Sequence, residues 1–171
     1  KSQLLAMHPD LEIVPVRGNI QTRINKIISE NLDGLIVAKA ALNRLKINYT
    51  NMHIFSENQM LPAAAQGAIG VEVCGSQIQS SILEILKMIN CQKTFTATKI
   101  EREIVAALEG TCLSPISALV TAQGSKLHLQ VRVSNQDGSA IIEKETTFKP
   151  KEALKAVLQF KTELLAEGAQ K

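Results

Sequence analysis

Residues 116–148 read ISALVTAQGSKLHLQVRVSNQDGSAIIEKETTF, and this stretch decides the fold of the second half of the chain. It holds three runs of strand-like composition, separated by two short connections that contain glycine. The runs are Ile116–Ala122, Lys126–Val133 and Ser139–Phe148, and the connections are Gln123-Gly124-Ser125 and Gln136-Asp137-Gly138. Connections of this kind are typical of β-hairpins, so the stretch predicts a three-stranded antiparallel sheet.

The middle run predicts which face of this sheet is buried. Its apolar residues stand at every second position, and side chains two residues apart share one face of a strand; they are Leu127, Leu129, Val131 and Val133. Helical patterns flank the sheet in the sequence. The first is a stripe of Phe95, Ile100, Ile104, Ala107 and Leu108 that ends at Gly110, a residue type typical of a C-terminal cap. The second runs from about Lys151 to Glu167, so residues 89–171 are predicted to form a small α+β domain.

The first half of the chain follows a different rhythm. Apolar runs of strand length alternate with helical patterns, which is typical of an α/β fold with parallel strands. The predicted strands are Leu11–Val16, Asp33–Ala38 and Gln66–Cys74. The predicted helices are Ser2–Met7, Ile20–Glu30, Lys39–Leu45 and a helix that Ser76 caps and that ends near Ile89.

Composition and charge exclude several classes of protein. The chain of 171 residues is 45% hydrophobic and 20% charged, as expected of a globular protein, and its net charge is +3. Lys and Arg are not clustered with aromatic residues, so we expect no nucleic-acid partner. No apolar run approaches the roughly 18 residues of a membrane span, so we expect no membrane partner. The first residue is Lys1 rather than Met, which indicates a fragment of a longer protein.

Three cysteines, Cys74, Cys91 and Cys112, have neither CxxC spacing nor a histidine partner, so we expect no metal site. Their odd number argues against a disulfide framework, and reduced thiols in the cytoplasm are the simpler interpretation. Cys74 and Cys91 are interpreted as small buried apolar side chains. Cys112 stands in a loop between Gly110 and Pro115, where a thiol can be both accessible and fixed. Taken alone, it also fits a small buried apolar side chain, which is the commoner role of a lone cysteine.

The segment Val16-Arg17-Gly18-Asn19-Ile20-Gln21-Thr22-Arg23 is suited to bind an anion. It lies where a predicted strand is followed by a helix, and the N–H groups at a helix N-terminus attract negative charge. Arg17 and Arg23 can add bidentate contacts to carboxylates. Two solvated arginines on a surface loop fit the same pattern. A further arginine, Arg44, lies near the end of the next helix, where a cation is favourable for structural reasons alone.

Small residues crowd the segment Pro62-Ala-Ala-Ala-Gln66-Gly67-Ala-Ile-Gly70. Such residues let the backbone approach a ligand closely, with Gln66 as the polar contact, and they suit a crossing between domains equally well. The last motif is Leu108-Glu-Gly-Thr-Cys112-Leu-Ser-Pro115-Ile116, the loop that carries Cys112 between the helical stripe and the first strand of the sheet.

In this order the four motifs resemble the porphobilinogen deaminase (hydroxymethylbilane synthase) family. The family pattern has Arg-Gly-Asn with a second Arg six residues after the first, then Leu-x-Arg-Leu, Pro-Ala-x-Gly-Gln-Gly-Ala and Leu-Glu-Gly-Gly-Cys-x-x-Pro-Ile. Here these stand as Arg17-Gly18-Asn19 with Arg23, Leu42-Asn43-Arg44-Leu45, Pro62-Ala-Ala-Ala65-Gln66-Gly67-Ala68, and Leu108-Glu-Gly-Thr111-Cys112-Leu-Ser-Pro115-Ile116. The resemblance covers essentially the whole chain.

The resemblance implies an α/β segment similar to periplasmic binding proteins, followed by a small α+β domain that carries a cofactor cysteine. It assigns residues 1–60 to part of domain 2, 61–88 to the return segment of domain 1, and 89–171 to domain 3. Nearly all of domain 1 is then missing, and with it the family's catalytic aspartate. We therefore expect no catalytic residue in this chain and no activity from the chain alone.

The implied activity is that of a cytoplasmic, monomeric transferase of tetrapyrrole and haem biosynthesis. It joins four units of the small-molecule substrate porphobilinogen into hydroxymethylbilane, with release of ammonia. The product grows on a dipyrromethane cofactor, which the resemblance attaches to Cys112 through a thioether. Carboxylates of cofactor and product are expected to bind Arg17, Arg23 and Arg44, and Gln66 and Gly67 are the remaining expected cofactor-binding residues.

Three residues depart from the family pattern: Ala41, Ala65 and Thr111 stand where the family usually has glycine. If such a position needs a positive φ, a side chain there costs on the order of 1 kcal/mol. Thr111 is expected to be the most awkward, because it is β-branched and adjoins Cys112. These departures support an alternative, a non-catalytic tetrapyrrole- or anion-binding module on the same scaffold. A domain pair without a formed site is the third interpretation.

Overall fold

The computed structural model describes residues 1–75 and 78–169. The chain forms two compact units. Lys1–Pro9 and Glu57–Lys171 make up one, which we call the C-terminal unit, and Asp10–Ser56 make up the other, which we call the inserted unit. The chain thus leaves the C-terminal unit after Pro9 and returns to it at Glu57.

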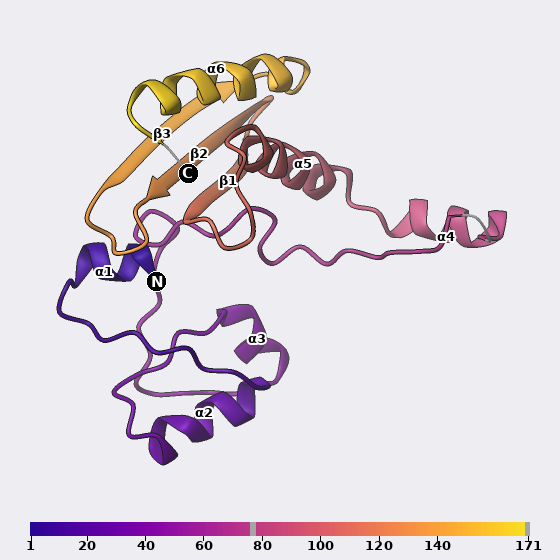
Figure 1. Ribbon diagram of the computed structural model, residues 1–171. Coiled ribbons are helices and arrows are strands. Elements are labelled where there is room, and N and C mark those ends of the chain that lie inside the picture. Colours follow the sequence, from indigo (N-terminus) through magenta and orange to yellow (C-terminus); the bar gives the residue numbers. More distant parts are fainter. Residues whose placement is uncertain (76–77, 170–171) are drawn as a thin grey trace. The chain divides into compact units, whose positions relative to one another are not determined.

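The C-terminal unit is built on the predicted antiparallel sheet (Figure 1). Strands β1 (Ile116–Gln123), β2 (Lys126–Ser134) and β3 (Ile141–Phe148) lie in the order β1-β2-β3. Tight turns at Gly124 and Gly138 join them, and both glycines have a positive φ. The sheet predicted from the two hairpin signals is therefore confirmed.

Two helices cover one face of this sheet. Helix α5 (Gln92–Ala107) packs on β1 and on α6 (Ala153–Ala166), and α6 also packs on β3 after the short 3-10 helix η1 (Pro150–Glu152). Ala118 pairs with Val131 and Val120 with Leu129 across the first two strands, which places these side chains on the helix-covered face. The core consists of Ile100, Ile104, Leu108, Ala118, Val120, Leu129, Val131, Val133, Phe148, Val157, Phe160, Leu164 and Ala169. The predicted burial of alternate residues in the middle strand is confirmed for Leu129, Val131 and Val133, while Leu127 is half-buried.

Two segments far apart in sequence, helix α1 (Ser2–Met7) and residues 58–63, also attach to the sheet. Ala63 forms an isolated antiparallel bridge with Ser117 of β1, and Leu61 is buried. The backbone of α1 touches the β2–β3 turn so closely that a Cβ on Gly138 would stand 2.5 Å from the carbonyl oxygen of Ser2. Glycine is required at that position for contact as well as for its φ of 75°.

The inserted unit contains helices α2 (Ile20–Ser29) and α3 (Lys39–Arg44), close to the predicted bounds. Each buries one apolar side chain, Ile24 and Leu42 respectively. In the C-terminal unit, α4 (Ser80–Ile89) begins later than predicted, its N-cap is Gln79, and the proposed cap Ser76 lies outside the described residues.

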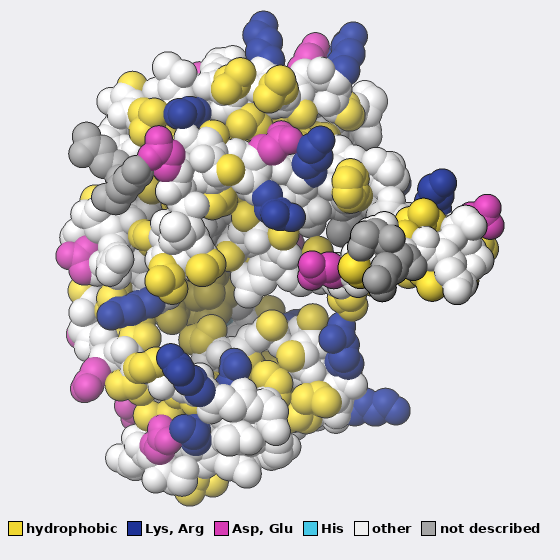
Figure 2. Space-filling model, turned by 45° about the vertical axis from the view of Figure 1, so that its right-hand side comes forward, with side chains coloured by type: hydrophobic (Ala, Val, Ile, Leu, Met, Phe, Trp, Pro, Cys, Tyr) yellow, Lys and Arg dark blue, Asp and Glu magenta, His cyan; other side chains and the backbone are white. Residues whose placement is uncertain are grey.

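The predicted strands Leu11–Val16, Asp33–Ala38 and Gln66–Cys74 are wrong for this structure, because none of these described segments is a strand. A strand exists only where a neighbour completes its ladder of hydrogen bonds, and apolar sequence alone does not supply one. Many of their apolar side chains accordingly stay exposed, with Ile69 at 79% and Val71 at 60%. Figure 2 shows apolar side chains reaching the surface over much of the viewed face.

Candidate functional site

Cys112 lies on a hydrogen-bonded turn between α5 and β1. The N–H of Ser114 donates to the carbonyl oxygen of Thr111 at 3.1 Å, which makes Cys112 the second residue of a β-turn. Side chains support the same turn, since the N–H of Thr111 donates to Ser114 Oγ at 2.9 Å and the N–H of Leu113 to Thr111 Oγ1 at 3.2 Å. The Cys112 thiol is exposed. A reactive group here is accessible to a ligand while its backbone is held in place.

The end of α5 fixes where this turn begins. The N–H of Gly110 donates to Val105 O, and that of Glu109 donates to Ala106 O, each at 2.9 Å, which is a Schellman arrangement. The left-handed residue is Glu109, with φ 54°, so the prediction of Gly110 as the cap is off by one position. Gly110 is needed for packing instead, because a Cβ there would stand 2.6 Å from Ile116 Cδ1.

The three residues that replace family glycines behave differently. Ala41 lies inside helix α3, where alanine is the most favourable residue. Thr111 is not among the described residues with a positive φ, and its hydroxyl accepts a hydrogen bond within the turn, so the expectation that it is the most awkward is wrong. Ala65 alone adopts the left-handed conformation, with φ 60°.

Gln66 and Gly67 lie on a small loop after Leu61. The N–H of Gln66 donates to Ala63 O at 3.0 Å, and the Gln66 side chain accepts from the N–H of Ala63 at 3.1 Å. Gly67 has φ 87°, and the space where its Cβ would stand is open for at least 4 Å. These two residues line one shallow pocket of about 270 Å³, together with Pro62, Thr98 and Glu101.

Glu101 holds this loop onto the sheet. Its carboxylate accepts the N–H of Ala65 at 2.7 Å through Oε2 and the N–H of Val120 at 2.8 Å through Oε1. Glu101 is only 5% exposed, so both of its oxygens need such partners. The contact links the Gln66 loop to the strand that follows the Cys112 turn.

In the inserted unit, Arg17 and Arg23 flank the start of α2. Asn19 caps this helix, and its side chain accepts from the N–H and the hydroxyl of Thr22 at 2.8 and 2.9 Å. Gly18 has φ 121°, and a Cβ there would stand 2.9 Å from Thr22 Cγ2. Arg23 Nε donates to Gly18 O at 2.7 Å, which orients its guanidinium across the turn. The structure thus brings Arg23 back to the residue that follows Arg17.

Arg44 is the last residue of α3, and its side chain is exposed. The helix ends in a second Schellman arrangement, in which Ile47 N–H donates to Leu42 O at 3.0 Å and Lys46 has φ 53°. Leu42 is buried. The Leu42-Asn43-Arg44-Leu45 motif therefore combines a core anchor with an exposed cation.

The interpretation of the other two cysteines as buried side chains is wrong, since Cys74 and Cys91 are both exposed. Cys91 precedes α5, and its thiol accepts a hydrogen bond from Thr94 Oγ1 at 3.2 Å. Hydrogen bonds from the hydroxyl and the N–H of Thr94 lower the pKa of this thiol. Cys91 is thus a second accessible thiol, whose reactivity has to be separated from that of Cys112.

Sequence reasoning missed two buried charged residues. Glu101 stands four residues after Ala97 and three before Ile104, on the apolar stripe of α5, and an acidic residue on such a stripe was a usable signal. Arg132 lies between Val131 and Val133 in β2, so the alternation of the strand predicted that its side chain points to the exposed face. It is buried because α1 and residues 58–59 cover it, and nothing local in the sequence indicates that contact.

Within the described residues no cluster of three or more His, Cys, Asp or Glu side chains could hold a metal ion. No helix in the same part of the chain is long and apolar enough to cross a membrane.

Comparison with known proteins gives one consistent result. Residues 1–80 match the family model described as "Porphobilinogen deaminase, dipyromethane cofactor binding domain", and residues 95–166 match "Porphobilinogen deaminase, C-terminal domain". Proteins named porphobilinogen deaminase from Campylobacter curvus, Lawsonia intracellularis and Carboxydothermus hydrogenoformans are 37%, 35% and 38% identical to it. Each alignment covers 99% of this chain and 54% of the relative, so the chain spans about half the length of these proteins. With both domain models matched in succession, the chain belongs to the porphobilinogen deaminase family.

Proposed function

We propose that the protein containing this chain is a transferase that joins four porphobilinogen units into hydroxymethylbilane, in tetrapyrrole biosynthesis. The observation that carries this proposal is the succession of both family domains, with an exposed cysteine on a fixed turn in the second. Each condensation releases one ammonia, and water releases the finished linear tetrapyrrole. The family's catalytic aspartate has no counterpart in the four motifs, so we expect no turnover by the 171 residues alone.

We propose Cys112 as the attachment point of the dipyrromethane cofactor. An exposed thiol fits this group, since sulfur is readily alkylated. A thioether, unlike a thioester, withstands the hydrolysis that releases the product. The hydrogen bonds around Thr111 and Ser114 support the choice, because they hold the backbone on both sides of the attachment point.

The carboxylates of the pyrrole units are assigned to Arg17, Arg23 and Arg44. A guanidinium binds a carboxylate through two parallel hydrogen bonds, and each charge-assisted contact contributes about 1.5–3 kcal/mol. The bond from Arg23 Nε to Gly18 O supports this role, because a guanidinium that is already oriented loses less freedom on binding. We assign Gln66 and Gly67 to a segment whose backbone the cofactor approaches closely. The open space beside Gly67 permits such an approach.

The proposal includes the domain plan of the family. It places residues 1–60 in domain 2, which would resemble a periplasmic binding protein, 61–88 in the return segment of domain 1, and 89–171 in domain 3. Support comes from the order of helices α2 and α3, each preceded by an apolar non-helical run, and from the sheet of the last segment. A monomer in the cytoplasm, acting on porphobilinogen, completes the proposal.

Intact-mass spectrometry of the whole protein purified from cells tests the proposal. We expect an added mass of two pyrrole units, absent in Cys112→Ser and retained in Cys91→Ser, which serves as the matched control for an exposed cysteine. An active enzyme of unmodified mass would refute the attachment. Bound dipyrromethane, detected by its Ehrlich colour, without turnover would favour the non-catalytic module. That alternative now has less support, because Ala41 and Thr111 adopt backbones that do not need glycine.

A further inference from the structure

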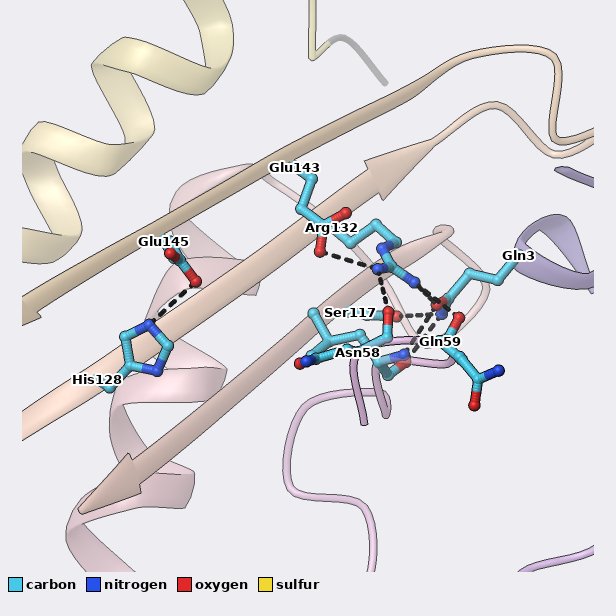
Figure 3. Close-up of polar contacts among 9 residues, drawn as sticks. Gln3, Asn58, Gln59, Ser117, His128, Arg132, Glu143 and Glu145 are labelled. Atoms are coloured by element: carbon cyan, nitrogen blue, oxygen red, sulfur yellow. Dashed lines mark hydrogen bonds and ion pairs between the residues drawn. The ribbon is translucent and has the colours of Figure 1, made fainter. Parts of the chain in front are cut away.

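Arg132 in β2 holds two segments of the chain at once (Figure 3). Its side chain is 8% exposed. Nη1 donates to Gln3 Oε1 and, at 3.2 Å, to Gln59 O, while Nη2 donates to Asn58 O at 2.9 Å. Nη2 also pairs with Glu143 Oε1 at 2.8 Å on the neighbouring strand, which offsets part of the cost of burying the charge.

Gln3 ties the same two segments to each other. Its Nε2 donates to Leu61 O at 2.8 Å, and its Oε1 accepts from the N–H of Leu61 at 2.9 Å, as a neighbouring strand would. Nε2 also donates to Ser117 Oγ at 3.0 Å. Ser117 and Arg132 are paired across β1 and β2, so the Gln3 side chain lies over one row of the sheet.

Other contacts keep α1 in position beside this pair. Ser134 Oγ donates to Ser2 Oγ at 2.8 Å. The β2–β3 turn lies against the backbone of the same helix at Gly138, where an added Cβ would stand 2.6 Å from the Ala6 nitrogen. Helix α1 is therefore docked along the sheet and not at a single point.

The two segments held here are the two connections of the inserted unit. Gln3 lies before the chain leaves at Pro9, and Asn58 and Gln59 follow directly after it returns at Glu57. We propose that Arg132 and Gln3 form a latch that holds both connections on the sheet, so that they are fixed together and released together. Arg17, Arg23 and Arg44 all belong to the inserted unit, which these two connections join to the rest of the chain. The relevance of the latch to these arginines rests on the proposed function, and the latch itself does not.

Hydrogen exchange of the 171-residue chain tests the latch. In Arg132→Met we expect the N–H groups of Leu5, His8 and Leu61 to exchange about tenfold or more faster, in both connections together, while the amides of the β1–β2 ladder keep their protection. Arg132→Lys keeps the positive charge, but an ammonium group cannot reach all four acceptors of the planar guanidinium. We expect the same amides to exchange faster in this variant, by a smaller factor than in Arg132→Met.

The matched control is Glu145→Gln, which removes the carboxylate from the 3.2 Å contact with His128 between the same two strands without touching either connection. It should leave the amides of both connections unchanged. Faster exchange in one connection only, or in neither, would overturn the proposal. If Arg132→Met does not fold or loosens the whole sheet, Gln3→Ala decides. Loosening of α1 and of residues 58–61 supports the latch, and loosening confined to α1 refutes it.

Discussion

The carboxylate of Glu101 accepts a hydrogen bond from the backbone N–H of Ala65 at 2.7 Å, across 36 residues of sequence. Its other oxygen binds the N–H of Val120, so one side chain of α5 joins the Gln66 loop to β1. Helix α5 thus holds the Gln66 loop through Glu101 and also leads directly into the Cys112 turn, which lies between α5 and β1.

Removing this carboxylate should be costly. Glu101→Ala leaves two N–H groups without their acceptor in a site that is only 5% exposed. We expect the free energy of unfolding to fall by about 3 kcal/mol, measured by urea denaturation. Glu103→Ala on the same helix is the control, because Glu103 pairs with the exposed Lys99 at 3.8 Å, and its loss should cost less than about 0.5 kcal/mol. Equal costs for the two variants would contradict the role given to Glu101.

Restoring the family's glycine should have opposite effects at two positions. Ala65 has φ 60°, so Ala65→Gly relieves a left-handed side chain and should stabilise the loop by about 0.5–1 kcal/mol. Ala41 is helical, so Ala41→Gly should destabilise α3 by a similar amount. Hydrogen exchange of the nearby amides, Ala68 for the loop and Leu45 for the helix, reports each change separately. A change of the same sign at both sites would contradict the opposite backbone requirements of Ala65 and Ala41.

The sheet and most helices could be predicted because their signals are local. Alternation in β2, the turns at Gly124 and Gly138, and helical spacing each depend on residues close together in sequence. The predicted strands before α2 and α3 failed for the opposite reason, since a parallel strand requires a partner from elsewhere in the chain. An apolar run such as Asp33–Ala38 shows only that burial would be favourable.

Among the polar residues too, roles that depend on neighbours in sequence could be predicted, and roles that depend on distant contacts could not. Gly18 and Asn19 could be interpreted from the helix start that they form: Asn19 accepts a hydrogen bond from the N–H of Thr22, and a Cβ on Gly18 would stand 2.9 Å from Thr22 Cγ2. Arg132 could not, because its acceptors Gln3 and Asn58 are 129 and 74 residues away. Its strand position predicted a solvated side chain, and only the docking of α1 and residues 58–59 makes it buried.

The Cys112 turn should respond to a single methyl group at Gly110. In Gly110→Ala the new Cβ would meet Ile116 Cδ1 at 2.6 Å, so we expect a loss of about 1–3 kcal/mol in urea unfolding. Ile116→Val removes the Cδ1 atom. The double variant should therefore lose less than the sum of the two single variants. If the losses in the free energy of unfolding of the two single variants simply add in the double variant, contact with Ile116 Cδ1 is not the reason that position 110 requires glycine.

Alkylation should distinguish Cys91 from the other exposed thiols through Thr94. The Thr94 hydroxyl donates to Cys91 Sγ at 3.2 Å, and together with the Thr94 N–H it lowers the pKa of the thiol, which raises the thiolate fraction at neutral pH. Thr94→Val keeps the side-chain shape but removes the hydroxyl, so the pKa should rise toward its ordinary value. Iodoacetamide should then react more slowly with Cys91 at pH 7, with the midpoint of its pH–rate profile moved upward, as followed by peptide mass spectrometry. Thr96→Val, on the same turn of α5, should leave this profile unchanged, and an unchanged profile in Thr94→Val would exclude the hydroxyl as the cause.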